Sequence, residues 1–286
     1  MLRWTHTLPL FCAVAAGCVG DIGDGRETGP DGPLDPHAFT CTPGDPSPTV
    51  LPRLSRAQYI ASLTELARRA TGDGEGVLAS LAASLISVPN DGDADHDRLD
   101  QTMTQAHVDG QYYVALAFAT ELTRDSATVE ALAGACAVDA DAGNDAACLE
   151  DFIRGFGFHA HRRPLTDAEV AFYRDEVFAP ATGMDPLALR DVVTVMVLSP
   201  WFLYRVENEG EALAGTEGVF RLSGYEMAAR LSLHFWDAPP DDQLLAAAAS
   251  GALDTEEGYA AEVDRLLADP RTQRTMDRFF SEWFDL

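Results

Sequence analysis

Three short segments of the sequence share one helix-start pattern. They read LSRAQY at 54–59, LTDAEV at 165–170 and LSGYEM at 222–227. In each, the Ser or Thr hydroxyl accepts from the backbone N–H three residues on, where a Gln or Glu side chain reaches back. The Leu before each box and the apolar residue after it form a hydrophobic staple. The pattern therefore predicts three helix starts, but no repeat, because the residues that follow differ.

Helical spacing of apolar residues continues along the chain. His107, Gln111, Ala115 and Phe118 recur at helical intervals, which predicts a long helix over 104–122. Other helices are predicted over 56–70, 77–87, 128–136, 149–161, 166–178, 187–198, 223–235, 239–250 and 254–267, and from 270 onward. No convincing strand series with a period of two appears. The expected fold class is mainly α, a multi-helix globular body.

The first residues have the composition of an export signal. Arg3 is the only formal charge before Cys18, and an apolar run covers residues 8–17. This run is about half as long as the roughly twenty residues that a membrane span needs. Its end, VAAGC at 14–18, resembles a bacterial lipoprotein cleavage box with Cys18 as the lipidated residue. The sequence therefore predicts an exported protein, anchored by lipid and facing the periplasm or cell surface. Ordinary secretion is the alternative.

Three cysteines follow Cys18, and an export compartment permits disulfides between them. Residues 20–48 are rich in Gly, Asp and Pro, which predicts a disordered tether. Cys136 and Cys148 flank a polar loop, and we expect a disulfide between them; two buried thiols are the alternative. Cys41 has no assigned partner.

The formal charge of −26 limits the binding partners. A surface this acidic repels the phosphates of nucleic acid, so no nucleic-acid partner is expected. A solvated acidic surface on an exported protein is the simpler explanation of the charge.

Several motifs together resemble one bacterial family. They are SPWFLYRVE at 199–207, RLSLHFW at 230–236 and PDDQLL at 240–245. This pattern is similar to the family catalogued as domain of unknown function 1592, from secreted proteins of planctomycete and myxobacterial type. RLSRAQY at 53–59 resembles the start of domain 1587, and the RRPLTDAE run at 162–169 resembles domain 1595.

The resemblance implies an order of modules but no mechanism, because no established activity comes with it. The expected organisation is a lipoprotein signal peptide at 1–17 and a tether at 18–50, then three helical modules. The modules are 51–135 (1587-like), 136–206 (1595-like, with the cysteine loop) and 207–286 (1592-like). The apolar face expected on the last helix, from Met276 to Phe284, suggests that the third module is incomplete at its C-terminus.

The only notable basic cluster contains His159, His161, Arg162 and Arg163. Its arginines are a candidate site for a carboxylate or phosphate group, and its histidines are candidate metal ligands. The favoured interpretation is structural, with the arginines paired to acidic neighbours at a turn between helices. Histidines two residues apart do not share a helix face, and no metalloprotease spacing accompanies them.

Two acidic loops are weak calcium candidates. The first offers Asp91, Asp93 and Asp95, and the second Asp139, Asp141 and Glu150. Neither has the Gly at position six and the Glu at position twelve that an EF-hand combines. No metal and no other cofactor is therefore predicted.

The sequence is compatible with three functions. The first is a surface-tethered helical protein that binds or scaffolds a protein or polysaccharide partner. The second is an exported enzyme acting on polysaccharide or another polymer, with catalytic parts in a missing C-terminal region. The third is a redox partner of a cytochrome. Only the resemblance suggests it, because some members of the family carry a c-type cytochrome module. The first is preferred, because no nucleophile elbow, P-loop or dinucleotide fingerprint is present.

Overall fold

A computed structural model describes most of the chain after residue 50. The described residues are 28–29, 32–33, 51–91, 102–180, 183–208, 210–214 and 219–284. They fall into two units, Met1–Pro48 and Thr49–Leu286. In the first unit, β1 (Thr28–Gly29) pairs antiparallel with β2 (Gly32–Pro33). The predicted signal peptide, Cys18 and Cys41 lie outside the described residues.

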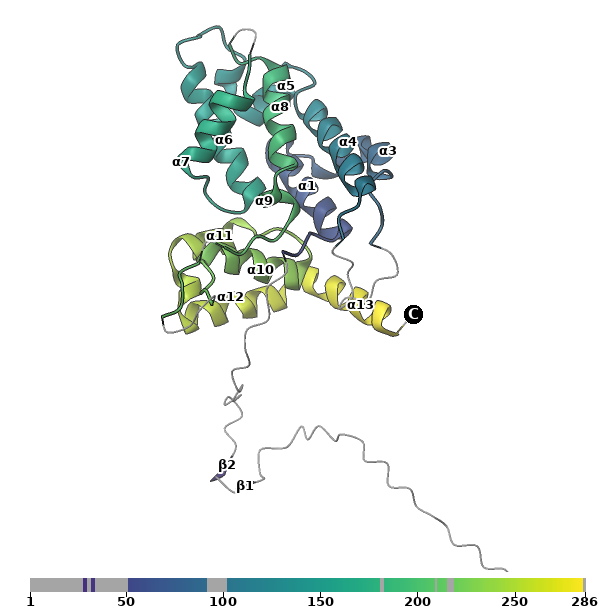
Figure 1. Cartoon of the computed structure of the whole chain (residues 1–286), viewed down its shortest axis with the longest axis vertical. Helices are drawn as coiled ribbons and strands as arrows, with labels where there is room; N and C mark the ends of the chain where they lie inside the picture. The colour runs from purple at the N-terminus through teal and green to yellow at the C-terminus, as the bar shows by residue number, and fades with distance from the viewer. Residues whose placement is uncertain are drawn as a thin grey trace, which may run out of the picture. The chain divides into compact units, whose positions relative to one another are not determined.

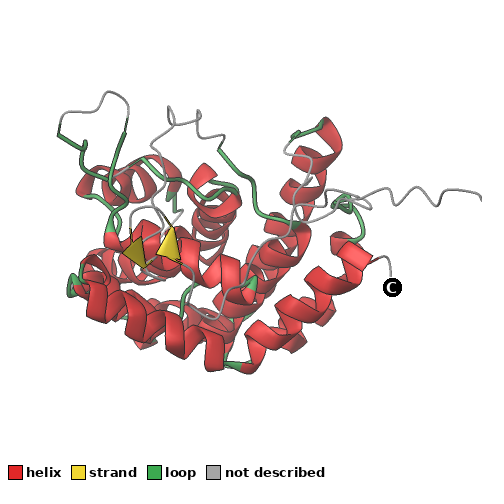
Figure 2. Ribbon diagram, turned by 90° about the horizontal axis from the view of Figure 1, so that it is seen from below, coloured by secondary structure: helices red, strands yellow, loops and turns green. Residues whose placement is uncertain are grey.

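The second unit is built of helices, so the prediction of a mainly α fold is confirmed (Figures 1 and 2). The α-helices are α1 (Arg56–Thr71), α2 (Gly74–Ser80), α3 (Ala82–Leu85), α4 (Gln105–Leu122), α5 (Ser126–Ala133), α6 (Asp145–His161), α7 (Asp167–Ala171), α8 (Pro186–Val197), α9 (Pro200–Leu203), α10 (Gly224–Trp236), α11 (Asp242–Ala249), α12 (Glu256–Ala268) and α13 (Pro270–Phe284). The shorter helical turns are η1 (Ala135–Ala137), η2 (Phe172–Val177) and η3 (Ala252–Asp254).

All three predicted capping boxes are present. The side chains of Ser55, Thr166 and Ser223 accept from the backbone N–H three residues on, and the Gln or Glu there bonds back to the cap. At its other end, α1 stops at Gly72, whose φ of 80° is left-handed. Glycine adopts that conformation without steric cost, which explains the sharp end of the helix.

Two predicted helices differ in the structure. The segment predicted as one helix over 77–87 forms α2 and α3, which meet at Leu81. α2 begins earlier than expected because the carboxylate of Asp73 accepts from the N–H of Gly76 and caps it. The helix predicted over 166–178 starts as α7 and widens into the π-helical turn η2. Spacing in sequence does not distinguish such a wider turn from an α-helix.

The second unit has two apolar cores. The larger is formed by residues of α1–α9, and its centre includes Leu63, Phe118 and Val193, all with 0% exposure. The smaller is formed within α10, α11, η3 and α12 around Trp236 and Leu266. Leu233 of α10 belongs to the larger core, so α10 joins the two. Figure 1 shows α10–α13 gathered at one end of the α1–α9 body.

Backbone hydrogen bonds fix the start of α1 against the segment that follows α9. The N–H of Leu54 donates to the carbonyl of Leu203 at 2.9 Å, and the N–H of Arg205 donates to the carbonyl of Pro52 at 2.9 Å. The Gln58 side chain then donates to the carboxylate of Asp237, just after α10, at 3.1 Å. The first turn of α1 is therefore held close to the end of α10.

The last helix, α13, exposes an aromatic end. Phe280, Trp283 and Phe284 are 44%, 65% and 60% exposed, and their rings stack on one another. The N-terminal half of α13 packs on α10 and buries Thr272 and Thr275. The apolar face expected on this helix is therefore open at its C-terminal end.

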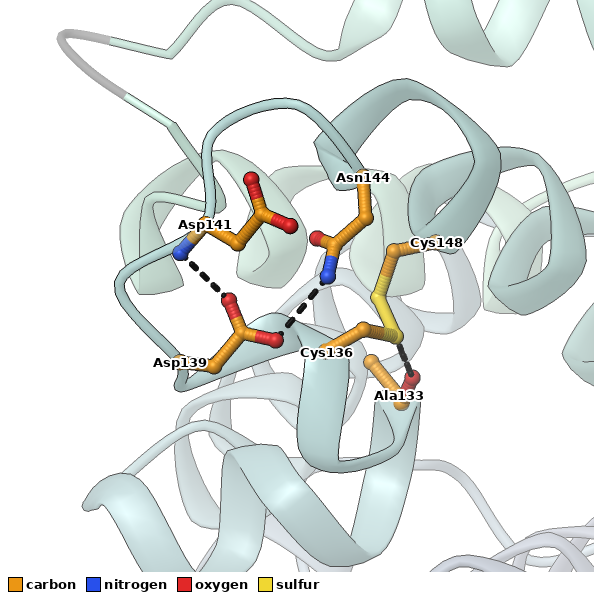
Figure 3. Close-up of a disulfide and its surroundings, with 6 residues drawn as sticks. All are labelled: Ala133, Cys136, Asp139, Asp141, Asn144 and Cys148. Atoms are coloured by element: carbon orange, nitrogen blue, oxygen red, sulfur yellow. Dashed lines mark hydrogen bonds between the residues drawn. A yellow bond between two sulfur atoms is a disulfide. The ribbon is translucent and has the colours of Figure 1, made fainter.

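The expected disulfide between Cys136 and Cys148 is confirmed (Figure 3). It joins η1 to the first turn of α6 and closes the acidic loop between them. Within the loop, the Asp139 carboxylate accepts from the N–H of Asp141 at 2.8 Å and from the Asn144 amide at 2.9 Å. The cross-link and these hydrogen bonds together hold the loop.

Opening this disulfide should lower stability without changing the fold. A short closed loop contributes about 3 kcal/mol by limiting the unfolded chain. We therefore expect the double variant Cys136→Ser/Cys148→Ser to lose about 2–3 kcal/mol in urea unfolding. A reductant should lower the stability of the wild type by a similar amount and leave the variant unchanged. Equal stability of the oxidised wild type and the variant would contradict this role.

Candidate functional site

The basic turn, residues 159–163, lies at the C-terminal end of α6. Arg162 ends the helix in the left-handed region, with φ of 60°, and Pro164 follows shortly. A left-handed residue redirects the chain, so consecutive side chains leave this turn in different directions.

Arg162 is buried and hydrogen-bonded to backbone carbonyls. Its Nη2 donates to the carbonyl of Trp201 at 2.5 Å and to that of Tyr204 at 2.7 Å, and its side chain also reaches the carbonyl of Phe202. Burial lowers the pKa of Arg162 to about 10, so the guanidinium still carries its charge at neutral pH. The charge therefore ties the end of α6 to α9 and to the residue that follows it.

Arg163 forms an ion pair with Glu169. Its Nη2 and Nη1 lie 2.8 Å and 3.0 Å from the two carboxylate oxygens, and its guanidinium stacks 3.9 Å from the centre of the Trp201 ring. Burial favours a higher pKa for Glu169, but hydrogen bonds from Arg163 and the N–H of Thr166 outweigh it and lower the pKa to about 2. Glu169 also completes the capping box of α7, so one carboxylate serves two contacts.

His161 is buried beside Ser199 and Tyr173. Its Nε2 lies 3.2 Å from Ser199 Oγ and 3.3 Å from Tyr173 Oη, and its Nδ1 lies 3.8 Å from a Glu169 oxygen. Ser199, His161 and Glu169 have the side chains of a Ser–His–acid triad. A substrate cannot reach them, however, because the His161 side chain is 1% exposed. Ser199 Oγ also accepts from the N–H of Phe202 and caps α9. The hollow beside His161 measures about 20 Å³, enough for one water molecule.

His159 faces α1 and shares a small hollow with Arg162, but not with His161 or Arg163. Its Nε2 is 3.3 Å from the Arg69 guanidinium of α1, while His161, Arg162 and Arg163 face Trp201 and the α9 segment. The four residues therefore do not line one cavity. Their role as a ligand or anion site stays a prediction, and the internal contacts of Arg162 and Arg163 favour the structural interpretation.

The acidic residues considered for calcium have other contacts. Asp91 accepts from Arg53 at 2.7 Å and from the N–H of Arg56 at 2.6 Å, so it caps the first turn of α1. Glu150 pairs with Arg154 at 2.8 Å. Asp93 and Asp95 lie outside the described residues. Within the described part of the chain, no group of three His, Cys, Asp or Glu side chains is arranged to hold a metal ion.

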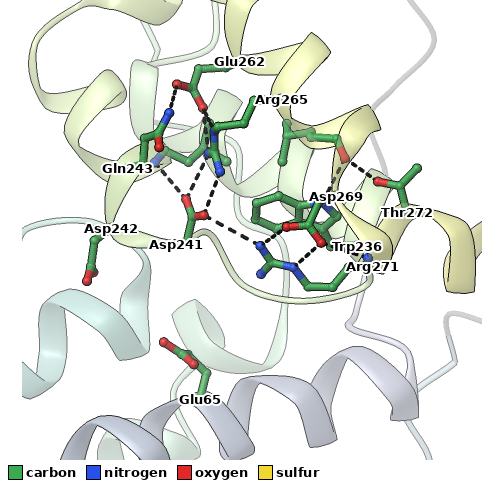
Figure 4. A network of polar contacts seen from close by, with 12 residues as sticks. Glu65, Trp236, Asp241, Asp242, Gln243, Glu262, Arg265, Asp269, Arg271 and Thr272 are labelled. Carbon is green, nitrogen blue, oxygen red and sulfur yellow. Dashed lines mark hydrogen bonds and ion pairs between the residues drawn. The ribbon is translucent and has the colours of Figure 1, made fainter.

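A large hollow of the second unit lies along α1. It is a cleft of about 1220 Å³ between the exposed face of α1 and the turn at 237–242, and Arg271 and Arg278 of α13 line it as well. Figure 4 shows Glu65 projecting from α1 toward the turn that carries Asp241 and Asp242. Small side chains, such as those of Ala57 and Ala61, leave room above the helix.

A second hollow borders the cleft near the C-terminal end of α1. It measures about 560 Å³ and is bounded by the later part of α1 and by α6, including Asp151, Gly155 and His159. The two hollows share Arg68, Arg69 and Asp242. The two hollows, which adjoin where Arg69 pairs with Asp242, are together called the groove below.

The 237–242 turn forms the wall of the groove opposite α1, and contacts with the smaller core hold it in place. Trp236 is buried and donates through Nε1 to the carbonyl of Leu266, while the guanidinium of Arg271 lies 3.4 Å from its ring centre (Figure 4). Arg265 pairs with Asp241 at 2.8 Å. The 237–242 turn, with Pro239 and Pro240 in it, is therefore anchored to the smaller core.

Most charges inside the groove are already paired. The chain has no lysine, and all its 20 Lys or Arg positions are arginines. Arg68 and Arg69 both pair with Glu65, and Arg69 also reaches across the groove to Asp242 at 2.7 Å. The remaining lining arginines behave similarly: Arg271 pairs with Asp269, Arg278 with Asp237, and Arg56 donates to the carbonyl of Leu85.

Sequence reasoning found the helices that border the groove but not the groove itself. The sequence predicts a helix from 239 and a capped helix from 56, and both starts belong to family motifs, but it predicts no cleft between these segments. The lining residues come from positions as distant as 55 and 278. No local signal in the sequence indicates that these segments meet.

Comparisons with known proteins identify two segments of the chain. Residues 148–207 match the family described as PSD5, protein of unknown function (DUF1595), and residues 222–286 match PSD4, protein of unknown function (DUF1592). The resemblance to domains 1595 and 1592 is therefore confirmed over these residues. α1 lies outside both ranges, and its resemblance to domain 1587 stays a prediction, as do the module boundaries. No similar protein was found among the curated proteins or the solved structures.

His161 should make stability depend on pH. Burial lowers the pKa of His161 to about 4, whereas an unfolded histidine titrates near 6.5. Between these values the unfolded chain binds more protons, so acidification favours unfolding, by up to about 3 kcal/mol. We expect the stability of the wild type, relative to His161→Gln, to fall as pH drops from 6.5 to 4. Urea unfolding at several pH values measures this difference, and a difference that does not change with pH would contradict the burial of His161.

Proposed function

We propose that this chain is an exported, membrane-anchored helical protein that binds a partner macromolecule in the groove along α1. The observation that carries the proposal is the groove itself, with a cleft of about 1220 Å³ and an adjoining hollow of about 560 Å³. Sites for small molecules usually occupy about 300–1,000 Å³. A long, open depression of this size suits a segment of a polymer better than a compact metabolite.

The fixed walls of the groove also support binding. The start of α1 is tied to the α9 segment by backbone hydrogen bonds, and the 237–242 turn is anchored through Trp236 and Arg265. A surface held in place before binding loses little conformational entropy when a partner arrives. The groove is therefore suited to recognition without rearrangement.

The enzyme and cytochrome-partner alternatives remain hypotheses. The nearest approach to a catalytic arrangement among the described residues is the contact between His161 and Ser199. Its histidine is buried and the adjoining hollow is too small for a substrate. Binding is therefore the function that the geometry favours.

Membrane anchoring is supported by the N-terminal sequence. Arg3, the apolar run at 8–17 and the box that ends at Cys18 have the order of a lipoprotein signal. None of the described helices combines the length and hydropathy needed to cross a bilayer. From the order of the signal sequence, we propose that the anchor is a lipid attached at Cys18.

A photo-crosslinker in the groove should capture the partner. Ala57 lies in the groove and Ala168 lies outside it, and each is an exposed second residue of a capped helix. We expect benzoylphenylalanine at 57 to give a discrete adduct in producing cells, and the same group at 168 to give none. The captured partner, once purified, should bind the wild type and lose affinity for Ala57→Trp. Identical adducts at both positions, or equal affinity for Ala57→Trp, would refute the proposed function.

Replacing Cys18 tests the anchor separately. We expect Cys18→Ala to move the protein from the membrane fraction to the soluble or secreted fraction, because no lipid can then be attached. Cys41→Ala is the matched control and should stay with the membrane. Membrane association of Cys18→Ala equal to that of the wild type would disprove lipid anchoring.

A further inference from the structure

We infer that the occupant of the groove is an extended polypeptide segment that carries basic side chains. The inference rests on the proposed function and adds the chemical class of the partner. It depends on three properties of the groove: its length, the charges that remain available in it, and its lining.

The length of the groove fits a short extended peptide. α1 has 16 residues, and with a rise of 1.5 Å per residue it spans about 24 Å. An extended chain advances about 3.3–3.6 Å per residue, so about seven residues cover the same distance. A partner segment of about this length that crosses the Arg69–Asp242 ion pair would contact both hollows.

The positive groups of the groove have little capacity left for a ligand. Both carboxylate oxygens of Glu65 accept from Arg68, at 2.6 Å and 2.8 Å, and Arg69 is held between Glu65 and Asp242. An acidic segment would compete with Glu65 and Asp242 for these guanidinium groups. This competition makes an anionic partner less favourable than a cationic one.

Carboxylates, in contrast, are available along the groove. Glu75 lines the cleft and Asp151 lines the adjoining hollow; both are exposed, and neither forms an ion pair with another described residue. Asp242, between them, is 74% exposed and pairs only with Arg69 within the described part of the chain. Three accessible carboxylates thus follow the groove, and guanidinium or ammonium groups are their natural partners.

The rest of the molecule favours the same partner. The formal charge of −26 attracts cationic segments over a distance and raises their association rate at low salt. Apolar and small side chains on the groove, among them Ala61, Ala238 and Pro239, allow a backbone to approach closely. No aromatic side chain lines the larger cleft among the described residues, so the stacking platform typical of glycan sites is missing there.

Fluorescence polarisation with two labelled octapeptides tests the inference on the intact lipid-free protein. One peptide alternates Arg and Ala, and its twin has Gln in place of each Arg. The groove variant is Glu75→Gln/Asp151→Asn. The control is Glu176→Gln/Glu257→Gln, which removes two exposed carboxylates that line neither hollow and so changes the net charge equally.

We expect the wild type to bind the Arg peptide at least about tenfold more tightly than the Gln twin. The groove variant should lose about fivefold or more in affinity for the Arg peptide, and the control less than about twofold. Equal losses in both variants would overturn the inference, because they would show attraction by total charge alone. Equal binding of the two peptides, or no binding of either, would overturn it as well. Capture by the crosslinker at position 57 decides separately whether the groove binds a partner at all, including a glycan.

Discussion

The guanidinium of Arg162 is the contact on which the arrangement of the second unit depends. It is a buried charge that donates to the carbonyls of Trp201 and Tyr204, and so it fixes α9 at the end of α6. Beside it, Arg163 stacks on Trp201 and holds Glu169, which starts α7. A buried charge without partners is costly, so this turn, α7 and α9 have to form together. The most conspicuous basic motif of the sequence thereby becomes a tie between helices.

One side of the groove depends on that tie. The segment after α9, held by Arg162, pairs with the residues just before α1 and sets where that helix begins. α10 then inserts Leu233 into the larger core, and the 237–242 turn comes to face α1 across an open space. Because the turn is anchored to the smaller core through Trp236, the space does not close by local rearrangement. Arg162 thus acts on the α1 side of the groove, while the contacts of Trp236 and Arg265 hold the opposite side.

The features that were predictable from sequence depend on contacts between residues that lie close together in the chain. The capping boxes at Ser55, Thr166 and Ser223 depend on contacts within four residues, and the disulfide joins cysteines 12 residues apart. The different directions of the side chains in the basic turn were not predictable. They depend on the left-handed residue Arg162 and on carbonyls about 40 positions away. The groove was not predictable either, since its lining residues come from positions as far apart as 55 and 278. Spacing also did not reveal the break at Leu81 or the π-helical turn.

The stability of Arg162→Met tests most directly whether the basic turn is a structural tie. Methionine keeps much of the side-chain volume but leaves the carbonyls of Trp201 and Tyr204 without their donor. An arginine kept for an external anion would behave differently, because replacing a functional charge usually leaves stability unchanged or raises it. We expect urea unfolding of Arg162→Met to show a loss of about 3 kcal/mol relative to the wild type. A change smaller than about 0.5 kcal/mol, or a gain in stability, would contradict it.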